Sequence, residues 1–276
     1  LIDKTAIFPK LYETLKSAEH KIQIEIFLLG GTIGSTIADI LIAKQQNGVQ
    51  IQLVVDSKLG ALDSFKDQII PTLKKLKEHG ITIKAFPVNV LPQDPTLISN
   101  IGIINHMKLV IVDESKAMFG GMNFVDTEAD NRDYMVYTEG PAAKALSPII
   151  AKDWQLSPDL KWKENYNKYS FHSQAFSPIL TEEPEQPFPG FRIGESWITK
   201  RSARRLVLDA IANAKESISA ELFMIDEPAV VEALVQAKYR GVKVRLLLDK
   251  VNLAKQAHPL LEKLEARPEV YHIAKR

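Results

Sequence analysis

The chain has 276 residues, of which 45% are hydrophobic and 25% charged, and its formal net charge is +1. This length allows one large domain or two of ordinary size, and the composition is that of an ordinary globular protein. The lack of cysteine excludes disulfides and thiolate zinc sites, and the near-zero charge means that any basic patch must be local.

Helical and strand patterns alternate in the first part of the chain. Apolar spacing predicts helices and apolar–polar alternation predicts strands. In chain order we expect a helix over residues 11–19, a strand over 21–29, a helix over 35–46, a strand over 49–56, a helix over 65–78 and a strand over 81–86. Strands that alternate with helices predict an α/β fold with a largely parallel sheet.

Glu25 lies on the first predicted strand, on the side opposite to Ile22, Ile24 and Ile26. A carboxylate on a central strand needs a partner if it is buried. Two interpretations are open, a polar partner within the fold or exposure to solvent at the end of the sheet. We prefer the second because it is the simpler.

A loop with several prolines, residues 87–100, leads to His106 and Lys108. These two residues are two apart, so on an extended strand their side chains leave the same face of the sheet. The apolar run that follows predicts a buried strand, which ends at Asp113.

Gly120 and Gly121 predict a tight turn just before Asn123. The stretch therefore offers an imidazole, a cation, an amide and the backbone N–H groups of a glycine turn. Such a set is suited to holding a phosphoryl group while histidine attacks it.

The last part of the chain repeats the first. Residues 211–225 parallel residues 15–29, and residues 240–249 parallel residues 47–56, so that Glu221 repeats Glu25 and Asp249 repeats Asp56. A repeat separated by more than a hundred residues predicts two similar halves rather than a solenoid. No second H-x-K pattern occurs between Asp249 and Arg276.

The pattern H-x-K-x4-D followed by x6-G-G-x-N resembles the signature of the phospholipase D superfamily, although many members have Ser where this chain has Gly121. It is formed by His106, Lys108, Asp113, Gly120, Gly121 and Asn123. Downstream, Asn131-Arg132-Asp133, Glu139-Gly140-Pro141 and Trp154 resemble the cardiolipin-synthase-like branch.

The resemblance implies an α/β fold of two duplicated halves, each with a largely parallel mixed sheet flanked by helices, and an active site where the halves meet. Residues 1–156 are then the first half with a complete motif, 157–198 a proline-rich connection and 199–276 the start of the second half. We expect a second motif from a C-terminal segment or a partner chain, and further residues before Leu1.

The resemblance also implies phosphoryl transfer through a covalent phosphohistidine, without a metal ion or other cofactor. His106 attacks, Lys108 neutralises a phosphate oxygen and Asn123 donates a hydrogen bond to it. Asp133 holds the imidazole in its productive tautomer, unless it is an ordinary helix-cap or surface aspartate. The expected catalytic residues are thus His106, Lys108, Asn123 and Asp133, with Gly120 and Gly121 binding substrate and Asp113 mainly structural.

Three functions are compatible with these residues. The first is a phospholipase D or phosphatidyltransferase that acts on a phospholipid, with peripheral contact to a membrane. The second is a nuclease of the same superfamily, favoured by a local basic set in the second half: Arg201, Arg204, Arg205, Lys238, Arg240, Lys243 and Arg245. The third is a non-catalytic binding module. The near-neutral charge favours the lipid enzyme over the nuclease, and the sequence assigns no compartment.

Overall fold

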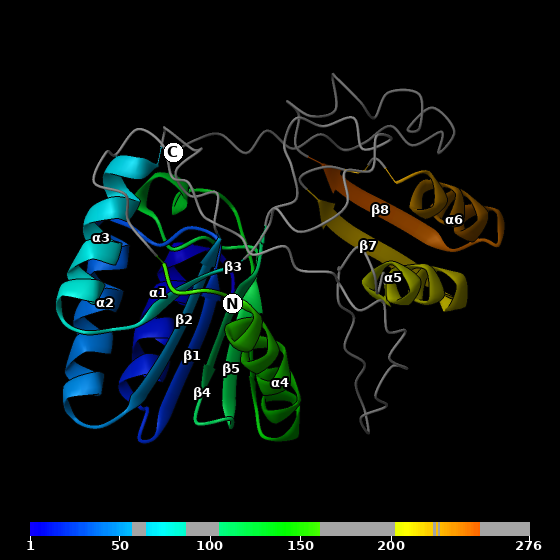
Figure 1. Cartoon of the computed structure of the whole chain (residues 1–276). Helices are drawn as coiled ribbons and strands as arrows, with labels where there is room; N and C mark the ends of the chain where they lie inside the picture. Colours follow the sequence, from blue (N-terminus) through cyan, green and yellow to red (C-terminus); the bar gives the residue numbers. More distant parts are fainter. Residues whose placement is uncertain (57–64, 87–104, 161–201, 223–224, 226, 249–276) are drawn as a thin grey trace. The chain divides into compact units, whose positions relative to one another are not determined.

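Figure 1 shows the computed structural model of the chain, which describes residues 1–56, 65–86, 105–160, 202–222, 225 and 227–248. The chain divides into two compact units, Leu1–Ile179 and Leu180–Lys275. The predicted loop 87–100 and nearly all of the predicted connection 157–198 lie outside the described residues. The predicted domain boundaries therefore stay a prediction.

The first unit contains a six-stranded sheet in the order β3-β2-β1-β4-β5-β6. Its strands are β1 (Lys21–Ile26), β2 (Gln50–Asp56), β3 (Ile83–Phe86), β4 (Lys108–Val112), β5 (Lys116–Gly120) and β6 (Met135–Glu139). Strands β1, β2 and β3 are parallel, whereas β4 pairs antiparallel with β1 and starts an antiparallel run through β5 to β6. The predicted α/β class is confirmed, and the sheet is mixed.

Helices cover both faces of this sheet. Figure 1 shows α1 (Asp3–Lys16), α2 (Gly31–Gln46) and α3 (Lys66–Glu78) on one face and α4 (Pro141–Leu156) on the other. The predicted first helix begins eight residues too late, because Pro9 lies inside α1 and proline usually marks a helix boundary. In the part of the chain that the structure describes, no helix is both long and apolar enough to cross a membrane.

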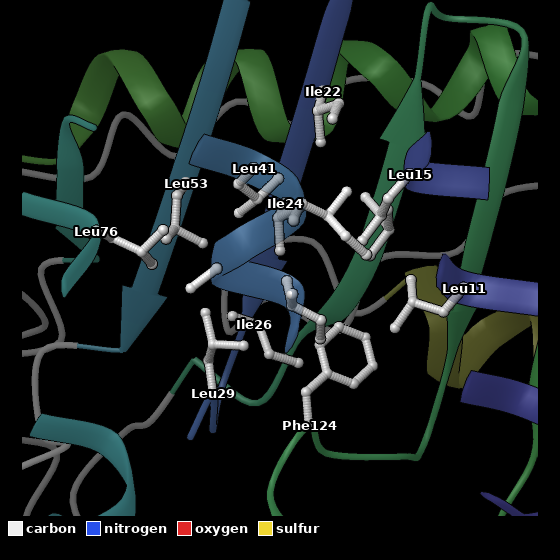
Figure 2. Close-up of a cluster of buried hydrophobic side chains, with 14 of the residues drawn as sticks. Leu11, Leu15, Ile22, Ile24, Ile26, Leu29, Leu41, Leu53, Leu76 and Phe124 are labelled. Atoms are coloured by element: carbon white, nitrogen blue, oxygen red, sulfur yellow. The ribbon is translucent and has the colours of Figure 1, made fainter. Parts of the chain in front are cut away.

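The main core lies between the sheet and the layer of α1, α2 and α3 (Figure 2). Ile22, Ile24 and Ile26 point into it from β1, as the alternation predicted, and each is at most 1% exposed. They pack with Leu11, Leu15, Leu41, Leu53, Leu76 and Phe124. Full burial of one such side chain contributes roughly 1.5–3 kcal/mol, so this layer holds the strands in register below the site.

The opposite face of β1 is buried too, and this corrects the preferred interpretation of Glu25. Glu25 is only 1% exposed and its Oε1 accepts a hydrogen bond from Asn105 Nδ2. Gln23 on the same face accepts a hydrogen bond from Ser147 Oγ of α4 at 2.7 Å. A helix on this side removes the solvent that an end-of-sheet carboxylate would otherwise face.

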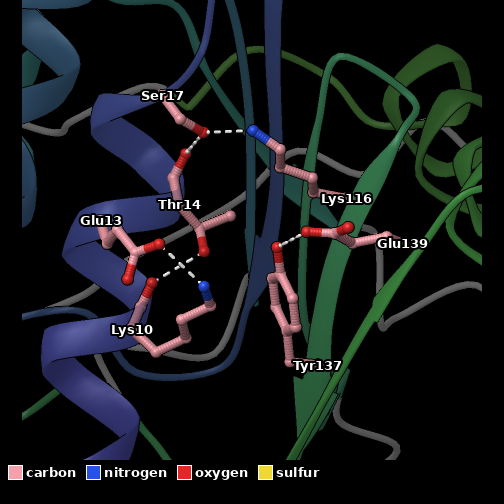
Figure 3. Close-up of polar contacts among 7 residues, drawn as sticks. All are labelled: Lys10, Glu13, Thr14, Ser17, Lys116, Tyr137 and Glu139. Atoms are coloured by element: carbon pink, nitrogen blue, oxygen red, sulfur yellow. Dashed lines mark hydrogen bonds and ion pairs between the residues drawn. The ribbon is translucent and has the colours of Figure 1, made fainter.

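Polar contacts join α1 to the antiparallel strands (Figure 3). Lys116 Nζ donates to Ser17 Oγ at 2.9 Å, the Lys10 ammonium lies 4.4 Å from the centre of the Tyr137 ring, and the Tyr137 hydroxyl donates to Glu139. Burial and the neighbouring Glu139 raise the pKa of Tyr137 to about 12. Partly exposed contacts of this kind are worth little singly, so the apolar core remains the main attachment of α1.

The second unit contains α5 (Ser202–Asn213), β7 (Ser217–Leu222), α6 (Pro228–Tyr239) and β8 (Lys243–Leu248). Strands β7 and β8 are parallel, and Glu221 lies opposite Leu247 just as Glu25 lies opposite Val54 in β1 and β2. The repeated sequences therefore form the same strand–helix–strand arrangement in the same register, as the duplication predicted. Val231, Leu234 and Ala237 belong to a separate core in this unit.

Candidate functional site

The motif lies where β1 ends and β4 begins. Ile26, the last residue of β1, pairs with Lys108, the first residue of β4, and His106 stands two residues before that pair. The carboxyl ends of parallel strands are the usual place for a binding site in an open α/β sheet. The antiparallel entry of β4 thus brings the motif to the ends of β1 and β2.

Phe27 joins the imidazole and the cation of the motif. Its ring centre lies 4.8 Å from that of His106 and 5.2 Å from Lys108 Nζ. We predicted that His106 and Lys108 lie on the same side of the sheet, and their contacts with one ring are consistent with that prediction. Sequence reasoning did not select Phe27, and its only signal was an aromatic residue at the end of a predicted strand.

The environment keeps His106 neutral. Partial burial, together with the charge of Lys108, lowers the pKa of His106 to about 4. The residue as a whole is nevertheless exposed. A neutral and accessible imidazole at pH 7 is the form that acts as a nucleophile.

Lys108 is buried and still largely protonated at pH 7. It is only 3% exposed, and its Nζ donates to the main-chain oxygen of His106 at 3.0 Å. Burial lowers the pKa of Lys108 to about 8, and the carboxylates of Glu128 and Asp133 oppose that shift. The result is a fixed positive charge next to the imidazole, in surroundings where water screens it weakly.

Asn123 is held by Glu128, a residue that the sequence analysis missed. Asn123 is 5% exposed, and its Nδ2 donates to Glu128 Oε2 at 2.5 Å. Its Oδ1 has no hydrogen-bond partner within the described residues. Glu128 closes the short 3-10 helix η2 (Asp126–Glu128), and no spacing rule marked it beforehand.

The glycine pair allows a close approach of two chain segments. A Cβ atom on Gly120 would lie 2.1 Å from the Tyr134 oxygen, and one on Gly121 would lie 2.2 Å from Asp133 Oδ1. Gly121 N donates to the Tyr134 oxygen at 3.0 Å. Neither glycine has a positive φ, and Gly120 closes β5, so the expected tight turn is instead a strand end with a close neighbour. Substrate binding by Gly120 and Gly121 stays a prediction.

Asp133 lies near the same cation. Its carboxylate acts on Lys108, and its Oδ1 also accepts the N–H of Tyr134 at 2.7 Å. Its own N–H donates to Asp3 Oδ1 at 3.2 Å, which ties the start of α1 to the site. The expected orientation of His106 by Asp133 stays a prediction.

Asp113 lies at the other end of β4, away from His106. Its carboxylate accepts the main-chain N–H groups of Glu19, His20 and Lys21 at 2.7 to 2.9 Å. Burial tends to raise the pKa of Asp113, but these three donors outweigh it and hold the pKa below its ordinary value. The geometry supports the structural role expected for Asp113.

Comparison with known proteins adds to this geometry. The family described as "Cardiolipin synthase, PLD-like domain" matches residues 11–154 and 207–275. The chain is 25% identical over 267 residues to a cardiolipin synthase of Alkalihalophilus pseudofirmus, covering 90% of this chain and 48% of that protein. It is 26% identical over 261 residues to cardiolipin synthase A of Buchnera aphidicola, covering 89% of this chain and 51% of that protein.

Among solved structures, the chain resembles one described as phosphatidylserine synthase of Haemophilus influenzae. The TM-score is 0.62 at 10% identity, and the match covers 90% of this chain and 61% of that one. At that identity the likeness concerns the fold alone. The chain spans about half the length of the curated relatives that it matches.

Proposed function

Because the chain belongs to the family of cardiolipin synthase phospholipase D-like domains, we propose that it is a phosphodiesterase or phosphatidyltransferase of phospholipase D type. Its substrate is a phospholipid, and the reaction passes through a covalent phosphohistidine at His106. The observation that carries this proposal is the pair formed by an exposed, neutral imidazole and a buried cation on the ring of Phe27.

The first step forms a bond between a ring nitrogen of His106 and phosphorus, and breaks the bond from phosphorus to the leaving oxygen. Lys108 stabilises the negative charge on the phosphoryl oxygens, and Asn123 donates its second amide hydrogen to one of them. Glu128 accepts the first amide hydrogen of Asn123, which fixes the orientation of the Asn123 side chain. Asp133 holds the imidazole, directly or through its neighbours, in the tautomer that attacks.

The leaving oxygen must take up a proton, and we assign this to the histidine of a second motif outside residues 1–276. In the second step an alcohol or water gives its proton to that group and attacks phosphorus. The bond to His106 then breaks, which restores the neutral imidazole. With a phosphatidyl donor and a glycerol-bearing lipid as acceptor, the product is a lipid with two phosphatidyl groups.

Two of the described basic residues that favour the nuclease alternative have partners within the second unit. Arg204 is paired with Glu227 at 3.0 Å, and Arg240 donates to the main-chain oxygen of Ile211 at 2.9 Å. Nucleic-acid grooves need cations that remain available to the backbone phosphates. Single-stranded DNA is therefore the comparison substrate in the test that follows.

The test is turnover by the full natural protein with a labelled phosphatidyl lipid, and in parallel with single-stranded DNA. His106→Ala should abolish lipid turnover without loss of folding, because His106 is an exposed residue outside the main core. Lys108→Ala and Asn123→Ala should each reduce turnover on the order of a hundredfold. His79→Ala, an exposed histidine at the end of α3, is the matched control. Retained turnover in His106→Ala, or DNA as the preferred substrate, would overturn the proposal.

A further inference from the structure

The main chain that carries His106 is not part of the sheet. Strand β4 begins at Lys108, and residues 105–107 precede it without regular strand pairing. Among the described residues, the backbone–backbone hydrogen bond of this stretch runs from Phe27 N to the Met107 oxygen at 2.9 Å. Something other than the sheet must therefore fix the position of His106.

Asn105 supplies three contacts next to His106. Its side-chain Nδ2 donates to Glu25 Oε1 and its main-chain N donates to Asp56 Oδ2, both at 2.5 Å. Its side-chain Oδ1 accepts the N–H of Met107 at 3.1 Å. The residues on either side of His106 are thus bonded through one amide side chain.

Glu25 and Asp56 form a rigid support for this amide. They are 1% and 0% exposed and lie at the ends of the adjacent parallel strands β1 and β2. Glu25 pairs with Val54, two residues before Asp56, so the two carboxylates share one face of the sheet. Lys108 pairs with Ile26 and therefore points to the other face. The hydrogen bonds from Asn105 therefore hold the main chain next to His106 on the face of the sheet opposite to Lys108.

Both carboxylates recur in the internal repeat. On the same face of β1 and β2, Gln23 and Gln52 correspond to Ser219 and Arg245 in the second unit. Glu25 and Asp56, in contrast, recur as Glu221 and Asp249 in the sequence. Two buried carboxylates are costly without donors, and in the first unit Asn105 supplies a donor to each of them.

We propose that Asn105, held between Glu25 and Asp56, is a positioning residue that sets the place and orientation of the His106 imidazole for attack on phosphorus. This proposal rests on the proposed function of His106. Its chemistry requires an amide, which can donate to a carboxylate and accept from Met107 N at the same time. An aspartate at position 105 still accepts the N–H of Met107. It cannot donate to Glu25, and it adds a third carboxylate beside those of Glu25 and Asp56.

The test exchanges donor and acceptor across the pair in the full natural protein. Asn105→Asp should lower kcat by about a hundredfold with little change in KM, since a nucleophile displaced by about 1 Å loses that much. Glu25→Gln should change kcat by less than about tenfold, because Gln Oε1 still accepts from Asn105. The double variant Asn105→Asp with Glu25→Gln restores one donor and one acceptor, and its kcat should return to within about tenfold of the parent.

A second readout does not require turnover. The titration of the His106 imidazole, followed by NMR, should shift in Asn105→Asp and return in the double variant. Asn47→Asp, an exposed amide at the end of α2, is the control for charge alone. The proposal fails if Asn105→Asp leaves kcat and the titration unchanged, or if the double variant stays as impaired as Asn105→Asp. An inactive parent protein would instead refute the proposed function, while the titration would still test the positioning of His106.

Discussion

His106 and Lys108 have opposite charge requirements, and their pKa values set the pH range in which both are met. The imidazole is neutral above a pKa of about 4, and the ammonium is charged below a pKa of about 8. Attack needs the first condition and phosphate binding the second. Between these two pKa values, His106 is neutral and Lys108 is charged, so both conditions for the proposed reaction are met.

The pH dependence gives the first prediction. Binding of a phosphate mimic such as vanadate should weaken as pH rises through about 8, where Lys108 loses its proton. Glu128→Gln removes a carboxylate that raises the pKa of Lys108, so the loss should begin at lower pH. Binding is measured by titration of the protein with vanadate across the pH range. Glu114→Gln, which is exposed beyond the far end of β4, should leave the profile unchanged.

The second prediction concerns the stability cost of Lys108. Its pKa is 10.5 in the unfolded chain and about 8 in the folded one, so protonated Lys108 destabilises the fold below pH 8. That cost fades as pH rises from 8 to 10.5. Lys108→Met should raise the free energy of unfolding at pH 7 by at most about 3 kcal/mol. The increase should be smaller at higher pH.

Denaturant unfolding at pH 7 and pH 10 measures this difference, and vanadate binding should be lost in the same variant. Lys144→Met, an exposed lysine on α4, provides the control. A Lys108→Met protein that is less stable than the parent at pH 7 would show that its partners outweigh burial.

At the scale of elements, Asp126 connects the site to α2. Its carboxylate accepts the N–H groups of Thr32 and Ile33 at 2.7 and 3.0 Å, at the start of the helix. Burial tends to raise the pKa of Asp126, and these donors outweigh it and lower the pKa. Gly31 is needed here, because its φ is +68° and a Cβ atom would lie 2.6 Å from the Asp126 carboxylate. The contact explains why α2 begins four residues before the predicted start.

The third prediction follows from this cap. Asp126→Ala should destabilise the protein by about 1 kcal/mol, as loss of a helix N-cap does. It should also weaken vanadate binding, since Asn123 and Glu128 stand on the same short segment. The stability difference should shrink as pH falls through the lowered pKa of Asp126, where the carboxylate of the parent becomes neutral. Thermal unfolding and vanadate titration check both effects.

Asp130→Ala is the matched control for the cap, because Asp130 lies on the same segment and, within the described part of the chain, forms an exposed ion pair with Lys4. Exposed pairs of this kind contribute about 0–1 kcal/mol. If both variants lost the same stability and the same vanadate binding, the effect would come from disturbing the segment and not from loss of the helix cap.

At the scale of the whole molecule, the first unit contains the complete motif and the second contains a matching strand–helix–strand arrangement. We expect phosphate binding to reside in the first unit, since His106, Lys108 and Asn123 all belong to it. The general acid for the leaving oxygen is expected elsewhere. Binding and turnover should therefore be separable.

The fourth prediction tests this separation. A protein limited to residues 1–276 should bind vanadate but turn over substrate about a hundred- to ten-thousandfold more slowly than the full natural protein, for lack of a general acid. Activity should return when a segment with a second H-x-K-x4-D pattern is supplied in the same chain or by a partner. Full turnover by monomeric residues 1–276 would mean that one motif suffices.

Features that depend on neighbours along the chain were predictable from the sequence. Alternation placed Ile22, Ile24 and Ile26 in the core. The two-residue spacing predicted a common side for His106 and Lys108, and their contacts with one Phe27 ring are consistent with that prediction. The duplication predicted a register that β7 and β8 reproduce. Side-chain period and spacing are local properties of a strand, which is why they can be read in advance.

The hydrogen-bond and ring partners of the site residues, in contrast, depend on the folded sheet. Glu25 meets Asn105 across 80 residues of chain, and the meeting depends on β4 entering antiparallel beside β1. The same entry places His106 and Lys108 next to the Phe27 ring, and burial of the two side chains at this position lowers both of their pKa values. Spacing cannot reveal such contacts, because chain segments far apart in sequence become neighbours only when the strand order of the sheet is fixed.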